Sequence, residues 1–173
     1  MLQDINVSSV RLIDIVNDFL EVSRLEQGRI EVHKEEFDMN ELISKVVRDL
    51  KSTTDKKSIS LDYLPPPNPL PKAVSDKGRV EQILVNLIGN AAKFTKQGGI
   101  KVSLDHIENF IIIRVTDTGI GISEHNQALL FRKFQQAGEQ MLARDVTQST
   151  GLGLNICKLI ISSLGGTIDL EKS

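Results

Sequence analysis

The sequence has little cysteine, no long apolar run and no excess of one charge, and each shortage excludes a class of protein. A single cysteine, Cys157, cannot form an internal disulfide, and its apolar neighbours indicate a small buried side chain. No apolar run approaches the roughly 20 residues of a membrane span, and the N-terminus has no signal-peptide pattern. The 21 basic and 23 acidic residues are mixed along the chain and form no basic stripe. We therefore expect a cytoplasmic protein that does not bind nucleic acid.

The residues that are present indicate one globular core with a short appendage, since the chain has 173 residues, 40% of them hydrophobic and 25% charged. Hydrophobic periodicity and turn residues predict the order helix, helix, strand, helix, two strands, helix, helix, strand. This order lacks a strict alternation of strands and helices. It favours an α+β fold, a two-layer α/β sandwich preceded by a long N-terminal helix, over a doubly wound sheet.

The first predicted helix, at about residues 3–27, has an apolar surface that is wide enough for more than one neighbour. Gly28 is predicted to end this helix. Such a surface is typical of a core helix in one globular domain, and equally of a bundle helix that meets a partner chain. Periodicity alone favours neither interpretation.

The later elements follow from caps, alternation and turn residues. Asp38 with Glu41 resembles a capping box that begins a second helix, and residues 59–63 alternate as in a half-buried strand. Five prolines between 65 and 71 then exclude regular structure. We further expect a helix over 77–94, a hairpin of strands 100–104 and 110–116 with a turn around 106–109, helices over 124–134 and 152–164, and a strand from Thr167. The polar-leaning residues 135–150 predict a mobile lid.

Asn86, Asn90 and Lys93 are spaced by four and three residues, so they lie along one line of the 77–94 helix, beside its apolar face. Amide oxygens can coordinate a hard cation such as Mg2+, and amide and ammonium donors can meet phosphate oxygens. The ordinary alternative is a solvated helix face. Because asparagine is a mediocre helix former, two of them one turn apart favour a functional role.

Asp117 follows directly on a strand whose alternate residues from Ile111 to Val115 share its face. A carboxylate at the end of an apolar face can accept a hydrogen bond in a partly dry pocket, and Gly119 and Gly121 let the backbone approach a flat ligand. An Asp-Thr-Gly turn without function is the alternative. An aspartic protease is excluded, because it needs two carboxylates in β-rich lobes.

The last helix is preceded by Ser149-Thr150-Gly151-Leu152-Gly153-Leu154. Backbone N–H groups at a helix N-terminus favour a phosphate group. A dinucleotide fingerprint would need a third glycine where Ile156 stands, and the sequence has no Gly-Lys-Ser/Thr of a P-loop. A glycine-rich start of an ordinary helix is the alternative.

Taken in order, four segments resemble the N, G1, F and G2 boxes of sensor histidine kinases of two-component systems. These segments are 86–95, 117–122, 131–134 and 150–154. Residues 16–20 and 23–26 resemble the end of the second dimerisation helix of the same family, so the resemblance covers nearly the whole chain. It implies that residues 1–28 are the C-terminal part of that helix and that residues 29–173 are the ATP-binding catalytic domain, with its last strand truncated.

The resemblance implies a Bergerat-type (GHKL) sandwich that binds ATP and Mg2+ between its helical layer and the lid. By position, Asp117 would bind the adenine amino group, Asn90 would coordinate Mg2+, and Asn86 and Lys93 would contact phosphates. The nucleotide-binding residues implied are Asn86, Asn90, Lys93, Asp117, Gly119, Gly121, Phe131, Phe134, Thr150, Gly151, Leu152, Gly153 and Leu154.

The activity implied is that of a protein-histidine kinase, which passes the γ-phosphoryl group of ATP to a histidine of a dimerisation domain. That domain, in the same or the partner protomer of a homodimer, and a response regulator are the implied partners. No acceptor is expected in this chain, because His33, His106 and His125 lack the acidic residue that follows the family's acceptor. Ser149 replaces the first glycine of the family's G2 box.

Two other functions stay open. An ATP hydrolase or ATP-driven clamp of the same superfamily would carry a glutamate one helical turn before the metal-binding asparagine. This chain has Asn86 there, so hydrolysis should be poor. The other is a non-enzymatic module that reports ATP to a partner.

Overall fold

The computed structural model describes residues 2–29, 31–133 and 151–171. The elements are α1 (Leu2–Glu26), β1 (Glu35–Phe37), α2 (Met39–Asp55), β2 (Ser60–Leu64), β3 (Ala73–Ser75), α3 (Lys77–Phe94), β4 (Gly99–Ile107), β5 (Phe110–Asp117), α4 (Glu124–Gln127) and α6 (Gly153–Ser163). The chain divides into two compact units, Met1–Glu31 with Ile122–Ser173, and Val32–Gly121. Within the described residues, no helix has the length and hydropathy that crossing a bilayer requires.

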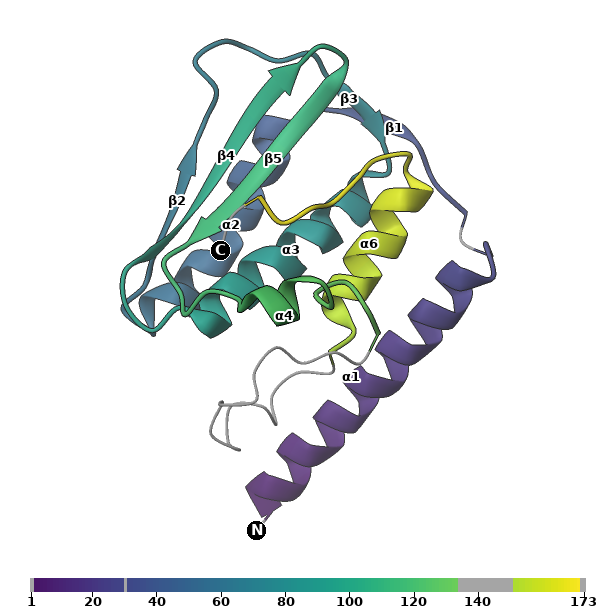
Figure 1. The fold of residues 1–173 in the computed structure, drawn as a ribbon, viewed down its shortest axis with the longest axis vertical. Helices are drawn as coiled ribbons and strands as arrows, with labels where there is room; N and C mark the ends of the chain where they lie inside the picture. Colours follow the sequence, from purple (N-terminus) through teal and green to yellow (C-terminus); the bar gives the residue numbers. More distant parts are fainter. Residues whose placement is uncertain (1, 30, 134–150, 172–173) are drawn as a thin grey trace. The chain divides into compact units, whose positions relative to one another are not determined.

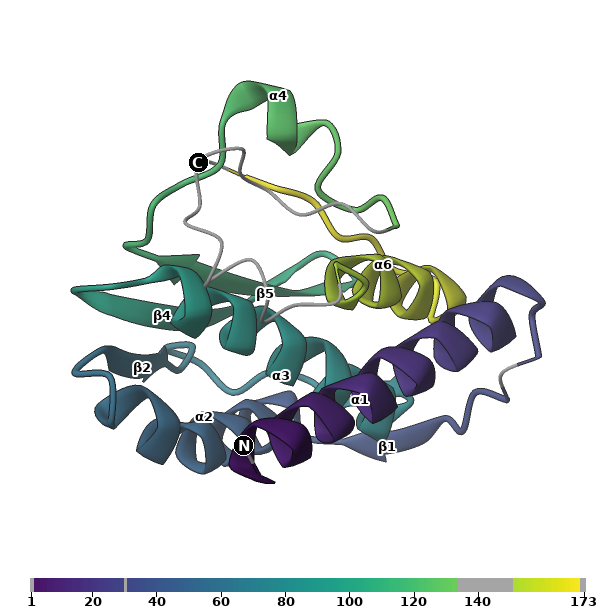
Figure 2. The ribbon, with the colours of Figure 1, turned by 90° about the horizontal axis from the view of Figure 1, so that it is seen from below.

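The unit Val32–Gly121 has two layers (Figures 1 and 2). Its three-stranded sheet has the order β2-β4-β5, with β2 parallel and β5 antiparallel to β4. One face of this sheet is covered by α2, which packs on β2, and by α3, which packs on β4 and β5. A separate antiparallel ribbon joins β1 and β3. The predicted α+β class and two-layer sandwich are confirmed.

The core of this unit lies between the sheet and its two helices. The central strand β4 contributes alternate residues that are at most 1% exposed, Ile100, Val102 and Leu104. The β4–β5 register places Ile113, Val115 and Asp117 opposite these residues. Since residues directly opposite in an antiparallel pair lie on the same face, Asp117 ends the apolar face that the helices cover.

Aspartate caps begin both helices of the unit. Asp38 accepts hydrogen bonds from two backbone N–H groups in the first turn of α2, as its capping pattern predicts. Asp76 accepts one from the N–H of Arg79 in α3 and one from the N–H of His33, both at 3.0 Å. Burial raises the pKa of the Asp76 carboxyl, but these hydrogen bonds to the charged form outweigh it and hold the pKa below its ordinary value.

In the other unit, α1 ends at the predicted glycine. Gly28 has a φ of +64°, and its N–H donates to the carbonyl of Leu25, while the N–H of Arg29 donates to the carbonyl of Arg24. This pair of hydrogen bonds is a Schellman motif, which favours glycine because the left-handed conformation strains other residues.

The helix α1 packs along α6, and Val22 on this side is only 4% exposed. The apolar surface of α1 extends well beyond this contact. Five large apolar residues are 47–63% exposed, Leu12, Ile13, Val16, Phe19 and Leu20. An exposed apolar stripe on a long helix favours the bundle-helix interpretation over that of a simple core helix.

Two predicted elements differ from the structure. The helix predicted over 124–134 ends at Gln127, because the N–H groups of Leu129, Leu130 and Arg132 bond to carbonyls three residues earlier and form tighter turns. The strand predicted from Thr167 is wrong for the described residues 167–171, which join no ladder. A strand requires a hydrogen-bonded neighbour as well as an alternating sequence.

The remaining segments are the short strands, the hairpin and the predicted lid. The short strands β1 and β3 were not predicted, although the hairpin of β4 and β5 was, with a turn that is limited to Glu108 and Asn109. The lid predicted over 135–150 lies outside the described residues.

Candidate nucleotide site

The predicted polar strip lies on α3. Asn86, Asn90 and Lys93 are all half-buried, so they lie at the border between the core side and the exposed side of the helix. The core side is formed by Val80, Ile83, Leu84, Ile88, Ala91 and Ala92. The ammonium of Lys93 lies 5.2 Å from the centre of the Phe94 ring, within the range of a cation–π contact. The strip therefore has the amide and ammonium groups where the spacing predicts them.

The carboxylate of Asp117 is held by the loop that follows it. Its Oδ1 accepts a hydrogen bond of 2.8 Å from the N–H of Gly119. This local turn fixes the carboxylate with one oxygen committed to the backbone. Within the described part of the chain, Oδ2 has no hydrogen-bond partner, so it is the atom available to a ligand donor.

This loop is also bonded to the C-terminal end of α3. The N–H of Ile120 donates to the carbonyl of Phe94 at 3.4 Å. The hydroxyl of Thr118 donates to the carbonyl of Gln97 at 2.9 Å and accepts from the N–H of Gly99 at 3.0 Å. The element that carries Asp117 is thereby attached to the helix that carries the polar strip.

Close packing explains why Gly119 must be a glycine. A Cβ on this residue would lie 2.6 Å from Oδ1 of Asp117 and 2.8 Å from the carbonyl oxygen of Phe94, both closer than real Cβ contacts. The chain itself thus occupies the space that a Cβ would fill, and the approach of this backbone to a flat ligand stays a prediction. The next predicted glycine, Gly121, has a φ of +71° and needs its conformational freedom.

One buried polar atom lies beside this loop. Thr95 is 3% exposed, and its hydroxyl has no hydrogen-bond partner among the described residues. A buried hydroxyl of this kind is normally satisfied by a water or by a ligand. The end of α3 therefore has unused hydrogen-bonding capacity next to Asp117's loop.

The glycine motif lies at the start of α6, in the unit of Met1–Glu31 and Ile122–Ser173. The helix begins at Gly153, and Gly151 before it has a φ of +70°. Leu152, at the N-cap, is 1% exposed and has no side-chain acceptor for the first N–H groups. The N-terminus of such a helix has backbone donors and a dipole that favour an anion.

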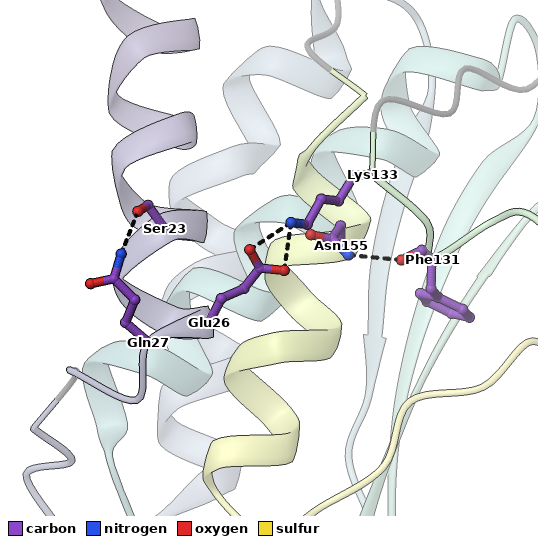
Figure 3. Close-up of polar contacts among 6 residues, drawn as sticks. All are labelled: Ser23, Glu26, Gln27, Phe131, Lys133 and Asn155. Carbon is purple, nitrogen blue, oxygen red and sulfur yellow. Dashed lines mark hydrogen bonds and ion pairs between the residues drawn. The ribbon is translucent and has the colours of Figure 1, made fainter.

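Phe131 belongs to the same unit and is bonded to α6 (Figure 3). Its carbonyl accepts a hydrogen bond of 3.0 Å from the side-chain amide of Asn155, and the ammonium of Lys158 lies 5.7 Å from its ring centre. Leu154 is half-buried. The predicted residues Phe134 and Thr150 lie outside the described residues, as does Ser149.

Sequence reasoning missed two residues that hold the site together. Thr118 was part of the Asp-Thr-Gly motif, but its hydroxyl received no role. Asn155 is 9% exposed and lies in the buried stripe of α6 with Ile156 and Ile160. A polar residue in an apolar stripe was the signal that could have identified it.

The predicted site residues thus fall into two groups, one in each compact unit. Asn86, Asn90, Lys93 and the Asp117 loop supply amide, ammonium and carboxylate groups, while α6 supplies backbone N–H groups. In the part of the chain that the structure describes, no three His, Cys, Asp or Glu side chains gather into a metal-binding group.

Comparison with known proteins finds a matching family and similar relatives. Residues 75–173 match the family described as histidine kinase-, DNA gyrase B-, and HSP90-like ATPase. The autoinducer 2 sensor kinase/phosphatase LuxQ of Vibrio cholerae is 38% identical over 168 residues, 95% of this chain and 19% of LuxQ.

Two solved structures are similar in fold. The crystal structure of full-length ShkA in complex with AMPPNP has a TM-score of 0.82 at 30% identity and covers 94% of this chain and 33% of that one. Histidine kinase ThkA in complex with the response regulator protein TrrA has a TM-score of 0.72 at 27% identity and covers 94% of this chain and 43% of that one. The chain spans between 10% and 28% of the length of the first curated relatives that it matches.

Proposed function

The chain belongs to the histidine kinase-, DNA gyrase B-, and HSP90-like ATPase family, and from this we propose that it binds Mg-ATP and donates the γ-phosphoryl group to a histidine. The reaction would take place in the cytoplasm, as a step of two-component signal transduction. The ATP-analogue complex of ShkA and the sensor-kinase name of LuxQ support this choice within the family.

The observation that carries the proposal is the geometry of Asp117. One carboxylate oxygen is bonded to the N–H of Gly119, and the other is left to accept a hydrogen bond at the end of an apolar face. An adenine ring suits such a place, because it has flat apolar faces and an amino group that donates. Guanine has a carbonyl oxygen at the corresponding position and would face the carboxylate with an acceptor.

The other residues take roles that fit their side chains. The amide oxygen of Asn90 would hold Mg2+, which neutralises charge on the phosphates. Asn86 and Lys93 would donate hydrogen bonds to phosphate oxygens, and the first N–H groups of α6, next to Gly151 and Gly153, would do the same. The proposed nucleotide-binding set is completed by Gly119, Gly121, Phe131, Phe134, Thr150, Leu152 and Leu154.

Transfer to a histidine is favoured over hydrolysis by Asn86. Water attack needs a general base, and an amide at this position cannot accept a proton. Phosphoryl transfer asks mainly for positioning of the nucleophile and for charge neutralisation, which amides, ammonium groups and backbone donors provide. An ATPase or a clamp of the same family is therefore the weaker alternative.

The acceptor and the partners belong to the same proposal. None of the three histidines stands on a long helix with a following acidic residue. His33 is in a loop, His106 on β4 and His125 on the four-residue α4. We propose a histidine of a dimerisation domain as acceptor, with residues 1–28 as part of that domain and 29–173 as the catalytic domain. The exposed apolar residues of α1 would face a second copy in a homodimer, and a response regulator would receive the phosphoryl group.

The test is incubation of the chain with Mg2+ and γ-labelled ATP, with and without a matched dimerisation domain that contains its histidine. We expect little incorporation by the chain alone and strong labelling of the added domain. The label should survive base and be lost in acid, as a phosphoramidate is. Rapid release of free phosphate would favour the hydrolase instead, and ATP binding without transfer would favour the non-enzymatic module.

A further inference from the structure

Residues 131–133 contact both α1 and α6 through side chains and backbone (Figure 3). On the α1 side, the ammonium of Lys133 lies 2.5 Å from each carboxylate oxygen of Glu26. Glu26 is the last residue of α1. This ion pair joins two positions that are 107 residues apart in the sequence.

The contact on the α6 side is of a different kind. Asn155 is buried, and its side-chain amide donates to the carbonyl of Phe131 at 3.0 Å. Within the described residues, the amide oxygen of Asn155 has no partner, so this single hydrogen bond orients the side chain. Asn155 lies in the first turn of α6, two residues after Gly153. A shift of Phe131 would therefore act on the helix turn that carries the proposed phosphate donors.

The end of α1 is well ordered by its own hydrogen bonds. The side chain of Gln27 donates to the hydroxyl of Ser23 at 3.1 Å, and the Schellman motif at Gly28 closes the helix. Glu26 is thus fixed to the helix end, and a movement of α1 would displace its carboxylate. The ion pair itself is half-exposed, with 40% and 41% of the two side chains accessible, so it is weak enough to break in a small movement.

We propose that residues 131–133 couple the position of α1 to the affinity of α6 for ATP. Glu26–Lys133 is the α1 end of this coupling and Asn155–Phe131 is the α6 end. With the ion pair formed, the first turn of α6 is held ready for the phosphates. With the pair broken, binding must also order this segment, so affinity falls. Because coupling is reciprocal, ATP would in turn favour the position of α1 that forms the pair. The inference rests on the proposed function.

Charge reversal tests the α1 end. The variants Glu26→Lys and Lys133→Glu should each weaken the affinity of the 173-residue chain for Mg-ATP by about two- to fivefold, and the double variant should regain it. The affinity is measured by titration calorimetry. The control is the pair Lys45–Glu81, which has the same 2.5 Å distance and similar exposure and joins α2 to α3. Its reversal should leave the affinity unchanged.

The proposal would be overturned if the single variants kept the affinity of the unmodified chain. It would also be overturned if the loss of affinity in the double variant equalled the sum of the two single losses. A second measurement needs no nucleotide. Hydrogen exchange at residues 155–158 should be faster in Lys133→Glu and in Asn155→Leu, and the two effects should not add, because both variants break the same connection.

The two measurements separate this inference from the proposed function. If the unmodified chain binds no ATP, the proposed function fails, while the exchange experiment still decides whether residues 131–133 connect α1 with α6. If ATP binds but the Lys133→Glu variant does not change hydrogen exchange in α6, the proposed coupling is wrong and the proposed function stands.

Discussion

Replacing Asp117 with asparagine should exchange the base preference of the site. In the unmodified chain, the N–H of Gly119 donates to Oδ1 of Asp117 at 2.8 Å. An asparagine still has an oxygen that can accept this hydrogen bond, so the loop should keep its conformation. The other oxygen becomes an amide N–H. This amide N–H would face the amino group of adenine, which is also a donor, so no hydrogen bond can form. The same N–H can donate to the O6 of guanine.

The size of the loss follows from the bond that is removed. A hydrogen bond to a charged group contributes about 1.5–3 kcal/mol, so Asp117→Asn should raise the Kd for Mg-ATP by about 10- to 150-fold. Asp117→Ala should lose as much affinity for Mg-ATP, and it should also remove the hydrogen bond that the N–H of Gly119 donates. The Kd values for ATP and GTP are measured by titration calorimetry on the unmodified chain and on both variants, with the midpoint of urea unfolding as the control for folding. Equal affinities for ATP and GTP in the unmodified chain, or an asparagine variant that keeps its preference for ATP, would refute the role of Asp117.

Three further predictions, one of them with Gly89→Ala as its matched control, concern other parts of the Val32–Gly121 unit. Asn90→Ala should abolish the Mg2+ dependence of ATP binding with little change in Tm, because a half-buried polar helix position contributes little to the core; a lower Tm with an intact Mg2+ response would make the residue structural. Gly119→Ala should destabilise the unit by about 1–3 kcal/mol in urea unfolding, since its Cβ would meet the Phe94 carbonyl. Gly89→Ala on α3, where a Cβ meets nothing within 4 Å, should instead stabilise by up to about 1 kcal/mol. The lowered pKa of Asp76 contributes stability that is present above its ordinary pKa of 3.8 and is lost as pH falls through the folded-state value. Asp76→Asn should make unfolding less sensitive to pH in this acid range, and an unchanged pH dependence would count against the capping carboxylate.

Local signals in the sequence were enough for most elements of the fold. The capping residue of α2, the periodicity of α3 and the turn residues of the hairpin each act within a few residues, so a pattern read along the chain captures them. The pairing of β1 with β3 could not be predicted in this way. Each strand has three residues, and its partner lies more than 30 positions away, as in the pair Glu35 and Ser75.

The candidate site follows the same division. The spacing of Asn86, Asn90 and Lys93 on α3 fixed the polar strip, and the strand before Asp117 fixed the face of its carboxylate. The hydroxyl of Thr118 joins this loop to Gln97 and Gly99, between α3 and β4, through tertiary contacts that no local pattern shows. The helix predicted over 124–134 was wrong beyond Gln127, because apolar spacing alone does not determine which carbonyls the backbone N–H groups bond to.

The order of strands in the sheet has a consequence for the rates of refolding. β4 and β5 are joined by a two-residue turn, whereas β2 reaches β4 only after β3 and α3 have been traversed. Contacts between neighbouring segments form sooner than contacts that close a long loop. We expect the β4–β5 hairpin and α3 to form first and β2 to join them last. In pulse-labelling experiments, amides that bond β4 to β5 should become protected earlier than the amides of Ser60–Leu64.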